Sequence, residues 1–263
     1  MANVRPPAVA GLFYPADPNV LQRSVEGYLA GATEFSHRPK AIIAPHAGYV
    51  YSAPIAASAY RLMEPMRGQI SRVVLLGPVH RVWVNGLALP DAQVFETPLG
   101  SISLDREAME QIAGLPQVEV LAAAHAQEHS LEVQLPFLQA VLGDFKLVPL
   151  AVGGATPDQV AEVLERLWGG DETLIVVSSD LSHYLPYQAS SNVDKATARS
   201  ILDLRTDLGG DQACGAHPIN GLLLAARHHG LRPHLLDLRN SGDTAGDRDR
   251  VVGYGAFAFT EMP

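Results

Sequence analysis

Short runs of apolar and β-branched residues recur along the chain and predict buried strands. Four of the five runs end in Gly, Pro or Asp, which are residues that favour turns. Continuous apolar runs of this kind are typical of strands that are covered on both faces of a sheet. The expected strands are 40–45, 72–78, 145–153, 174–180 and 251–259.

Between these runs lie segments whose apolar residues recur at helical spacing. In one of them Leu131, Leu135, Leu138 and Leu142 form a single apolar stripe, which predicts a helix packed on the core. The expected helices are 18–30, 53–62, 104–112, 130–142, 157–167, 192–204 and 218–229. Because strands alternate with helices, the pattern predicts a single α/β domain over 1–263, with a largely parallel sheet and helices on both faces.

Composition narrows the class of protein. Of the 263 residues, 47% are apolar and 18% are charged, values typical of a globular domain. The formal charge of -9, without a cluster of Lys or Arg, argues against a nucleic-acid partner. Cys214 is the one cysteine, and the sequence shows neither a secretion signal nor an apolar run of membrane-spanning length. We therefore expect a cytoplasmic protein without a membrane segment.

Several strand candidates finish in a side chain that can carry chemistry. His46 follows the first, His80 follows the second, and Asp180 ends the fourth, with His183 one helical turn further on. Ligands of open parallel sheets bind just outside the carboxyl ends of the strands, so these four side chains are expected to meet in one crevice. A single histidine at such a position is more often an ordinary loop residue.

Cys214 adds a thiol to this set. It lies just before Pro218, which we expect to begin a helix, and a helix N-terminus is expected to lower the pKa of the thiol. Imidazole and thiolate suit zinc, copper or iron, so His46, His80 and Cys214 form a candidate metal triad. The structural alternative is that Cys214 is a small buried apolar residue.

The segment Glu128-His129-Ser130 precedes the helix with the leucine stripe. Ser130 is a candidate cap for that helix, and Glu128 and His129 are candidate acid/base or supporting groups, although a solvated loop is the simpler interpretation. His228 and His229 lie at a helix end, where cations are favourable. The remaining histidines that lack a motif are interpreted as surface residues: His37, His125 and His234.

Taken together, these segments resemble the Memo family over essentially the whole chain. The matching segments are RPPAVAGLFYP at 5–15, APHAGY at 44–49, LGPVH at 76–80, EHSLE at 128–132, SSDLSH at 178–183, CGAHP at 214–218 and VVGYGA at 251–256. The resemblance implies a fold similar to class III extradiol dioxygenases, which hold non-haem iron with two histidines and a glutamate. It also implies that His46, His80 and Cys214 match the metal ligands, and that Asp180 and His183 lie beside the metal.

A cysteine in place of the glutamate makes ring cleavage doubtful, because thiolate is softer and more easily oxidised than carboxylate. Iron or copper is the expected metal, with zinc as a further possibility. Prokaryotic members resemble protein B of the AmmeMemoRadiSam system. The resemblance therefore implies a radical SAM enzyme and an Ammecr-type protein as partners.

Three functions stay open at this point. The first is a metal-dependent redox enzyme in which His183, with Asp180 or His129, moves protons. The second is a non-catalytic module that binds a small molecule or peptide in the crevice, or delivers metal to a partner. The third is a hydrolase in which His183 or His80 activates Cys214 as a nucleophile.

Overall fold

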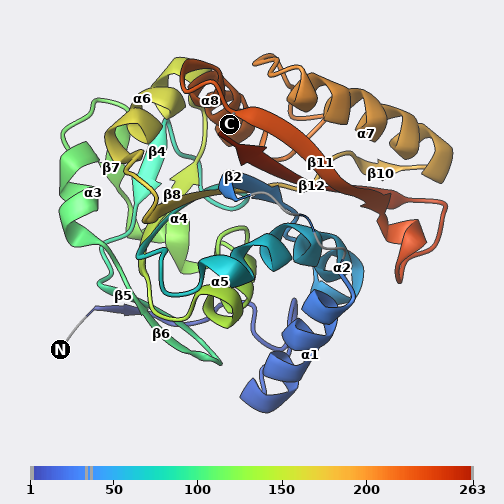
Figure 1. The fold of residues 1–263 in the computed structure, drawn as a ribbon, viewed down its shortest axis with the longest axis horizontal. Helices are drawn as coiled ribbons and strands as arrows, with labels where there is room; N and C mark the ends of the chain where they lie inside the picture. The colour runs from blue at the N-terminus through green and yellow to red at the C-terminus, as the bar shows by residue number, and fades with distance from the viewer. Residues whose placement is uncertain (1–2, 33–34, 36–37, 262–263) are drawn as a thin grey trace.

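A mixed sheet of nine strands forms the centre of the protein, which the computed structural model describes over residues 3–32, 35 and 38–261. The strand order is β10-β12-β2-β9-β3-β8-β4-β7, with β11 paired to β12 (Figure 1). The middle four strands are parallel to one another. They are β2 (Pro39–Ala44), β9 (Thr173–Ser178), β3 (Arg72–Pro78) and β8 (Lys146–Val152).

The strands on either side of this parallel core bring in antiparallel pairs, so the expectation of a largely parallel sheet was wrong. β12 runs antiparallel to β2, β10 and β11, and β4 runs antiparallel to β8 but parallel to β7. The physical reason is local, since the short link from β11 to β12 allows a hairpin, whereas parallel neighbours need a long crossover. These strands are β12 (Val251–Thr260), β10 (His183–Leu185), β11 (Arg232–Asn240), β4 (Leu87–Leu89) and β7 (Val118–Val120).

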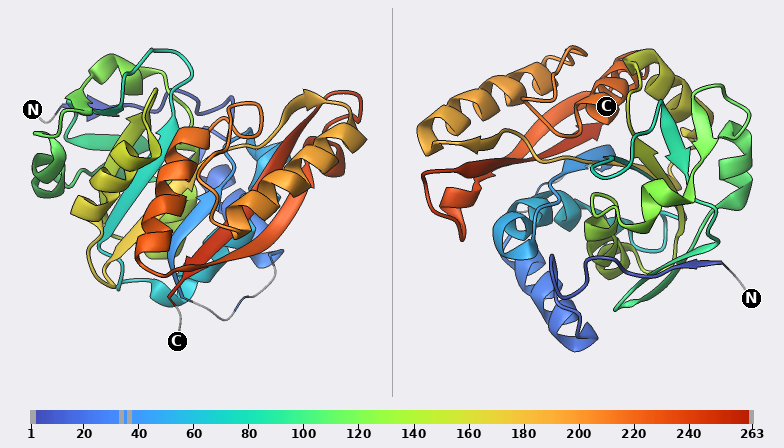
Figure 2. Two further views of the ribbon diagram at one scale, coloured as in Figure 1. Left: turned by 90° about the horizontal axis from the view of Figure 1, so that it is seen from above. Right: turned by 180° about the vertical axis from the view of Figure 1, so that it is seen from behind.

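Helices cover both faces of the sheet, as predicted (Figure 2). Successive strand residues point to opposite faces, so Ile42 and Val73 belong to one core, whereas Ile43 and Val74 belong to the other. The first core is covered by α1 (Pro18–Ala30), α2 (Tyr49–Tyr60), η1 (Arg61–Met66) and α5 (Leu135–Leu142). The second is covered by α3 (Arg106–Ile112), α6 (Pro157–Leu167), α7 (Tyr187–Leu202) and α8 (Ala216–His228).

The helix that was expected over 130–142 is shorter than its leucine stripe suggests. A 3-10 turn, η2 (Glu132–Gln134), comes first, and α5 begins only at Leu135. Ser130 therefore does not cap the helix, and its hydroxyl instead donates to the Pro78 carbonyl at 2.8 Å. This contact ties the segment before α5 to the end of β3.

A smaller sheet of three strands lies apart from the central one. Its strands are β1 (Val4–Arg5), β5 (Val94–Thr97) and β6 (Gly100–Ser103). The short helix α4 (Ala122–Ala126) follows β7 and precedes the segment of Glu128. β1 brings the start of the chain against β5, and its last residue, Arg5, donates to the carbonyls of His125 in α4 and of Glu128 in the loop that follows.

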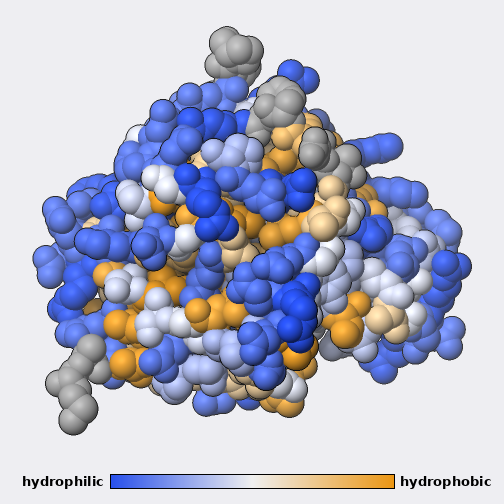
Figure 3. All heavy atoms as spheres, turned by 60° about the horizontal axis from the view of Figure 1, so that its bottom comes forward, coloured by the Kyte–Doolittle hydropathy of each residue, from blue (hydrophilic) through white to orange (hydrophobic). Residues whose placement is uncertain are grey.

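On the face shown in Figure 3, polar side chains predominate and apolar side chains lie among them. Large apolar side chains that are exposed include Leu12, Val50, Trp83 and Tyr184. Among the described residues, no helix combines the length and the apolar character needed to cross a bilayer.

Candidate metal centre

The candidate site forms where three neighbouring strands end. His46 lies two residues beyond the end of β2, His80 two residues beyond β3, and Asp180 two residues beyond β9. Because β9 pairs in parallel with both β2 and β3, all three ends lie at the same edge of the sheet. This edge is where ligands bind in open α/β sheets.

Three imidazoles meet at this edge. Candidate ligand atoms of His46, His80 and His129 all lie within 4.8 Å of one another. The His80 and His129 rings are stacked with centroids 4.6 Å apart, and His46 meets both rings edge-on. His46 is buried, His129 is half-buried and His80 is exposed, so the cluster is open on the His80 side. This cluster could hold a metal ion.

The tautomer of His46 follows from its neighbour Ser178. The Ser178 hydroxyl donates to the Ser130 carbonyl at 2.6 Å, and its oxygen accepts from the Gln134 amide at 2.7 Å. Its one proton is used, so it must also accept from His46 Nδ1 at 2.9 Å. The lone pair of His46 is then on Nε2. Burial, and then the neighbouring imidazoles, hold the pKa of His46 well below its usual range, which keeps this lone pair available.

Glu128 fixes His80 in the same way. Its carboxylate accepts from His80 Nδ1 at 2.8 Å and from the backbone amides of His80, His129 and Ser130 at 2.6 to 2.9 Å. Burial alone would raise the pKa of Glu128, but the His80 contact and these amides outweigh it and lower the pKa to about 2. Glu128 is therefore a carboxylate that leaves Nε2 of His80 free, an arrangement common around metal-binding histidines.

The solvated-loop interpretation of Glu128 and His129 was wrong. Glu128 is only 2% exposed, and its segment is held from beneath by Arg5. The Arg5 guanidinium donates to the carbonyls of Glu128 and His125 and forms a buried ion pair with Glu132. Sequence reasoning missed both Arg5 and Glu132, although both lie in segments that carry the family resemblance.

Asp180 supports the backbone of His46. Its Oδ1 accepts from the His46 amide at 2.8 Å and from the Ala47 amide at 3.3 Å, and its Oδ2 lies 3.9 Å from His46 Nε2. Burial raises the pKa of Asp180 despite these contacts. The second oxygen of Asp180 therefore faces the cluster and is a candidate to hold a proton there.

Cys214 lies beside the cluster, with Sγ 3.4 Å from His46 Nε2 and 3.8 Å from Ser179 Oγ. It is not among the three residues whose ligand atoms are mutually within 4.8 Å. The expected lowering of its pKa was wrong, because burial and the nearby Asp180 raise the pKa of Cys214 to about 12. Cys214 also comes before Gly215, the N-cap of α8, and this helix begins two residues earlier than Pro218.

The other histidines divide between the site and the rest of the molecule. His183 is half-buried at the start of β10, where it is paired with Val252, and its charge would lower the pKa of Asp180. His125 was wrongly interpreted as a surface residue, because it is 2% exposed and its Nε2 donates to the Ala88 carbonyl. His234 is half-buried, and His37 lies outside the described residues.

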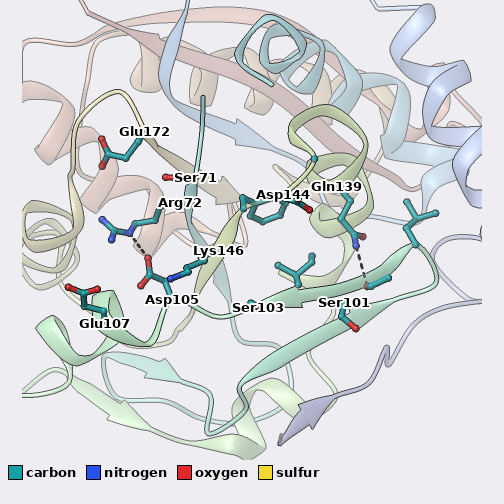
Figure 4. Close-up of a pocket in the computed structure, with 15 residues that line it drawn as sticks. Ser71, Arg72, Ser101, Ser103, Asp105, Glu107, Gln139, Asp144, Lys146 and Glu172 are labelled. Carbon is teal, nitrogen blue, oxygen red and sulfur yellow. Dashed lines mark hydrogen bonds and ion pairs between the residues drawn. The ribbon is translucent and has the colours of Figure 1, made fainter. Parts of the chain in front are cut away.

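Two pockets lie at opposite ends of the central strands, and only one of them is lined by a residue of the histidine cluster. A pocket of about 330 Å³ opens beside the cluster and includes His80 and Cys214 in its wall. A larger one, of about 830 Å³, lies at the opposite edge, where β3 and β8 begin (Figure 4). Arg72 and Asp105 form an ion pair of 2.8 Å in its wall. This larger pocket is lined by none of the three histidines and is therefore not part of the candidate metal site.

The donor atoms of the cluster fit a transition metal. Imidazole nitrogen suits zinc, copper, iron and nickel, and a nearby thiol favours the softer ions among them. The tautomer of His46 presents an unprotonated Nε2, and the Nδ1 contact of His80 with Glu128 leaves Nε2 as the atom of that ring that can bind metal.

Comparison with other proteins places the chain in a family. Relatives described as MEMO1 family proteins are 38% identical in Ignicoccus hospitalis, 35% in Aquifex aeolicus and 34% in Sulfolobus acidocaldarius. Each alignment covers 97% of this chain and at least 98% of the relative. A crystal structure of an uncharacterized protein from Escherichia coli K12 is similar in fold, with a TM-score of 0.51 at 14% identity over 82% of this chain and 99% of that one.

The Escherichia coli protein supports the α/β fold, but it is described as uncharacterized and so does not test the likeness to extradiol dioxygenases. The family model described as Memo-like protein matches residues 5–258, a range that contains the histidine cluster, Asp180 and Cys214. This protein therefore belongs to the Memo-like family.

Proposed function

We propose that this protein is a metal-dependent enzyme whose metal is held by Nε2 of His46 and Nε2 of His80. One observation carries the proposal: the three imidazoles of the cluster offer ligand atoms within 4.8 Å of one another at the carboxyl ends of the parallel strands. Ser178 and Glu128 occupy the Nδ1 atoms of His46 and His80, which supports both rings in the orientation that a metal needs.

The third ligand is either His129 or Cys214. The distances favour His129, whereas the family resemblance favours Cys214, whose Sγ lies 3.4 Å from His46 Nε2. A thiolate ligand would favour copper or zinc, and a set of three imidazoles also suits iron. When bound, such a metal supplies Lewis acidity and, in the case of iron or copper, one-electron chemistry.

The residues around the cluster supply groups that can hold and move protons. Asp180 is buried with a raised pKa and directs one oxygen toward His46, and His183 is near enough to influence Asp180 electrostatically. In the proposed redox enzyme, Asp180 and His183 exchange protons with the substrate, as the base of a dioxygenase-like site would. The fold alone does not bring ring-cleaving activity with it.

Metal content tests the proposal directly. The wild-type protein, loaded with Fe²⁺, Cu²⁺ or Zn²⁺ and desalted, should retain about one metal ion per chain by elemental analysis. The variants His46→Ala and His80→Ala should lose it, while His228→Ala, which removes an exposed imidazole far from the cluster, should not. Full metal content in both cluster variants would refute the proposal.

The same measurement identifies the third ligand. If His129 is the ligand, His129→Ala loses metal and Cys214→Ala retains it. If Cys214 is the ligand, Cys214→Ala loses metal and His129→Ala retains it. Full metal content in Cys214→Ala would therefore exclude Cys214 as a ligand.

Two alternatives are weaker but testable. In a hydrolase, Cys214 would act as a nucleophile, yet burial raises its pKa to about 12, which disfavours the reactive thiolate. Rapid alkylation of Cys214 at neutral pH in metal-free protein would support that alternative. In a non-catalytic module, ligand binding would survive His183→Ala.

We also propose the two partners that the family resemblance implies, a radical SAM enzyme and an Ammecr-type protein. Co-elution of the purified proteins tests this association.

A further inference from the structure

The pocket beside the histidine cluster has walls of two different kinds. Its volume of about 330 Å³ is at the lower end of the range of about 300–1,000 Å³ for small-molecule sites. One part of the wall is polar and contains His80, Arg81, Cys214 and His217. The other part is apolar or without side chains: Pro78, Val79, Val82, Trp83, Val152, Gly153 and Gly154.

Trp83 lies beside a stretch of the pocket wall that has no side chains, Gly153-Gly154. The indole is 81% exposed, which is unusual for so large an apolar side chain. A Cβ on Gly154 would lie 3.5 Å from the outer edge of the Trp83 ring, so this edge of the indole lies beside the Gly154 backbone. A Cβ on Gly153 would come within 2.0 Å of the Val84 carbonyl oxygen, so only glycine fits there. The exposed indole beside this backbone suits a planar apolar group.

The polar part of the wall favours an anion. No Asp or Glu lines the pocket, although the chain as a whole carries a formal charge of -9. Arg81 makes no ion pair or hydrogen bond with any residue that the structure describes, so its charge is free to meet a ligand. His217 is exposed, and its Nδ1 donates to the Ala155 carbonyl at 2.8 Å, which fixes the ring at the pocket wall.

From these two parts of the wall, we propose that the substrate is a small organic anion with a planar apolar body. Its carboxylate or phosphate pairs with Arg81, and its planar part lies against Trp83 and the Gly153-Gly154 backbone. The rest of the molecule then faces His80 and Cys214, beside the metal site. That the bound anion is a substrate rests on the proposed function. Its binding in this pocket needs no metal. The volume fits one small molecule.

Binding of benzoate, phenyl phosphate and benzamide to metal-free protein in EDTA tests the inference. Trp83 and Trp168 are the two tryptophans, so in a Trp168→Phe background the fluorescence reports on Trp83 alone. Benzoate or phenyl phosphate should change this fluorescence saturably. Neutral benzamide should bind about 10- to 100-fold more weakly, the range expected for loss of a charge-assisted hydrogen bond. The better of the two anions identifies the acidic group.

Two variants separate the two parts of the pocket. Arg81→Gln should abolish the preference for benzoate over benzamide, and Arg23→Gln, on the exposed face of α1, should leave it unchanged. Trp83→Ala should weaken binding of both ligands, as measured by ligand-observed NMR. Equal affinity for benzoate and benzamide in the parent protein, or no saturable binding of either anion, would overturn the inference. Metal content is measured separately, so its loss would count against the metal site and not against this pocket.

Discussion

Glu128 contacts both the backbone of the site and the imidazole of His80. The carboxylate accepts the Nδ1 proton of His80 and three backbone amides, which accounts for its low pKa and its almost complete burial. The imidazole of His129 lies above the same carboxylate, with Nδ1 3.3 Å from Oε1. A change at this one residue should therefore affect two of the three imidazoles.

Replacement of Glu128 by Gln should weaken metal binding by about 10- to 100-fold, because the partner that orients His80 is altered. The measurement is competition for zinc against a chelator of known affinity. Glu119→Gln, on the exposed part of β7, is the matched control and should bind zinc as the wild type does. Unchanged zinc affinity in Glu128→Gln would contradict a supporting role for this carboxylate.

The same substitution predicts a pH dependence of stability. Folding lowers the pKa of Glu128 from 4.5 to about 2, so its contribution is fully present above pH 4.5 and is lost as the pH falls toward 2. The difference corresponds to roughly 3 kcal/mol. The free energy of unfolding of metal-free wild type should exceed that of Glu128→Gln most above pH 4.5, and the gap should shrink in acid. A gap that stays constant from pH 6 to pH 3 would count against this account.

At the scale of elements, β1 and the residues that follow it hold the loop that carries Glu128 and His129. Arg5 is 6% exposed and Glu132 is fully buried, and they form an ion pair that bridges the start of the chain and η2. Glu132 also accepts from the amides of Ala8 and Val9 and from the Tyr14 hydroxyl. Among the residues that the structure describes, all the donors to this carboxylate therefore lie within residues 5–14.

Removal of the guanidinium by Arg5→Met should destabilise the protein by about 3–5 kcal/mol, because Glu132 would remain buried without its cation. Urea unfolding measures this loss. Arg23→Met, at an exposed position of α1, should change the free energy of unfolding by less than about 0.5 kcal/mol. Equal stability of the two variants would show that the buried pair does not anchor the loop.

The elements that were predictable are those that carry their own signal. The expected strand 72–78 matches β3, and 145–153 matches β8 to within a residue at each end, because continuous apolar runs mark strands covered on both faces. β11 (Arg232–Asn240) was missed because it contains charged residues and is mostly half-exposed. Its strand conformation depends on pairing with β12, which a local pattern does not reveal.

At the scale of the whole molecule, the residues of the site also divide into those with a local sequence signal and those placed by distant contacts. His46 and His80 were predictable because each directly follows a strong strand signal. The position of His129 was not, because its loop is held by contacts with residues far away in the sequence, such as Arg5, Pro78 and Ser178. Their place just before the leucine-striped helix made Glu128 and His129 candidates, but only the fold brings His129 to the other two imidazoles.

Metal bound at the proposed site should also stabilise the whole fold, because the ligands come from three separate segments of the chain. At a free metal concentration 100-fold above Kd, the gain is about 2.7 kcal/mol, or roughly 5–10 °C in Tm for a protein of this size. Differential scanning calorimetry should show this shift with zinc in the wild type. His46→Ala should show none, and a similar shift in this variant would place the metal elsewhere.

The most direct test of the central claim is a crystal structure of the zinc-loaded protein with anomalous data at the zinc edge. The account predicts one strong peak about 2.0–2.1 Å from Nε2 of both His46 and His80, with His129 or Cys214 as the third ligand. A peak bound by other residues, or none at the cluster in crystals that hold zinc elsewhere, would contradict it.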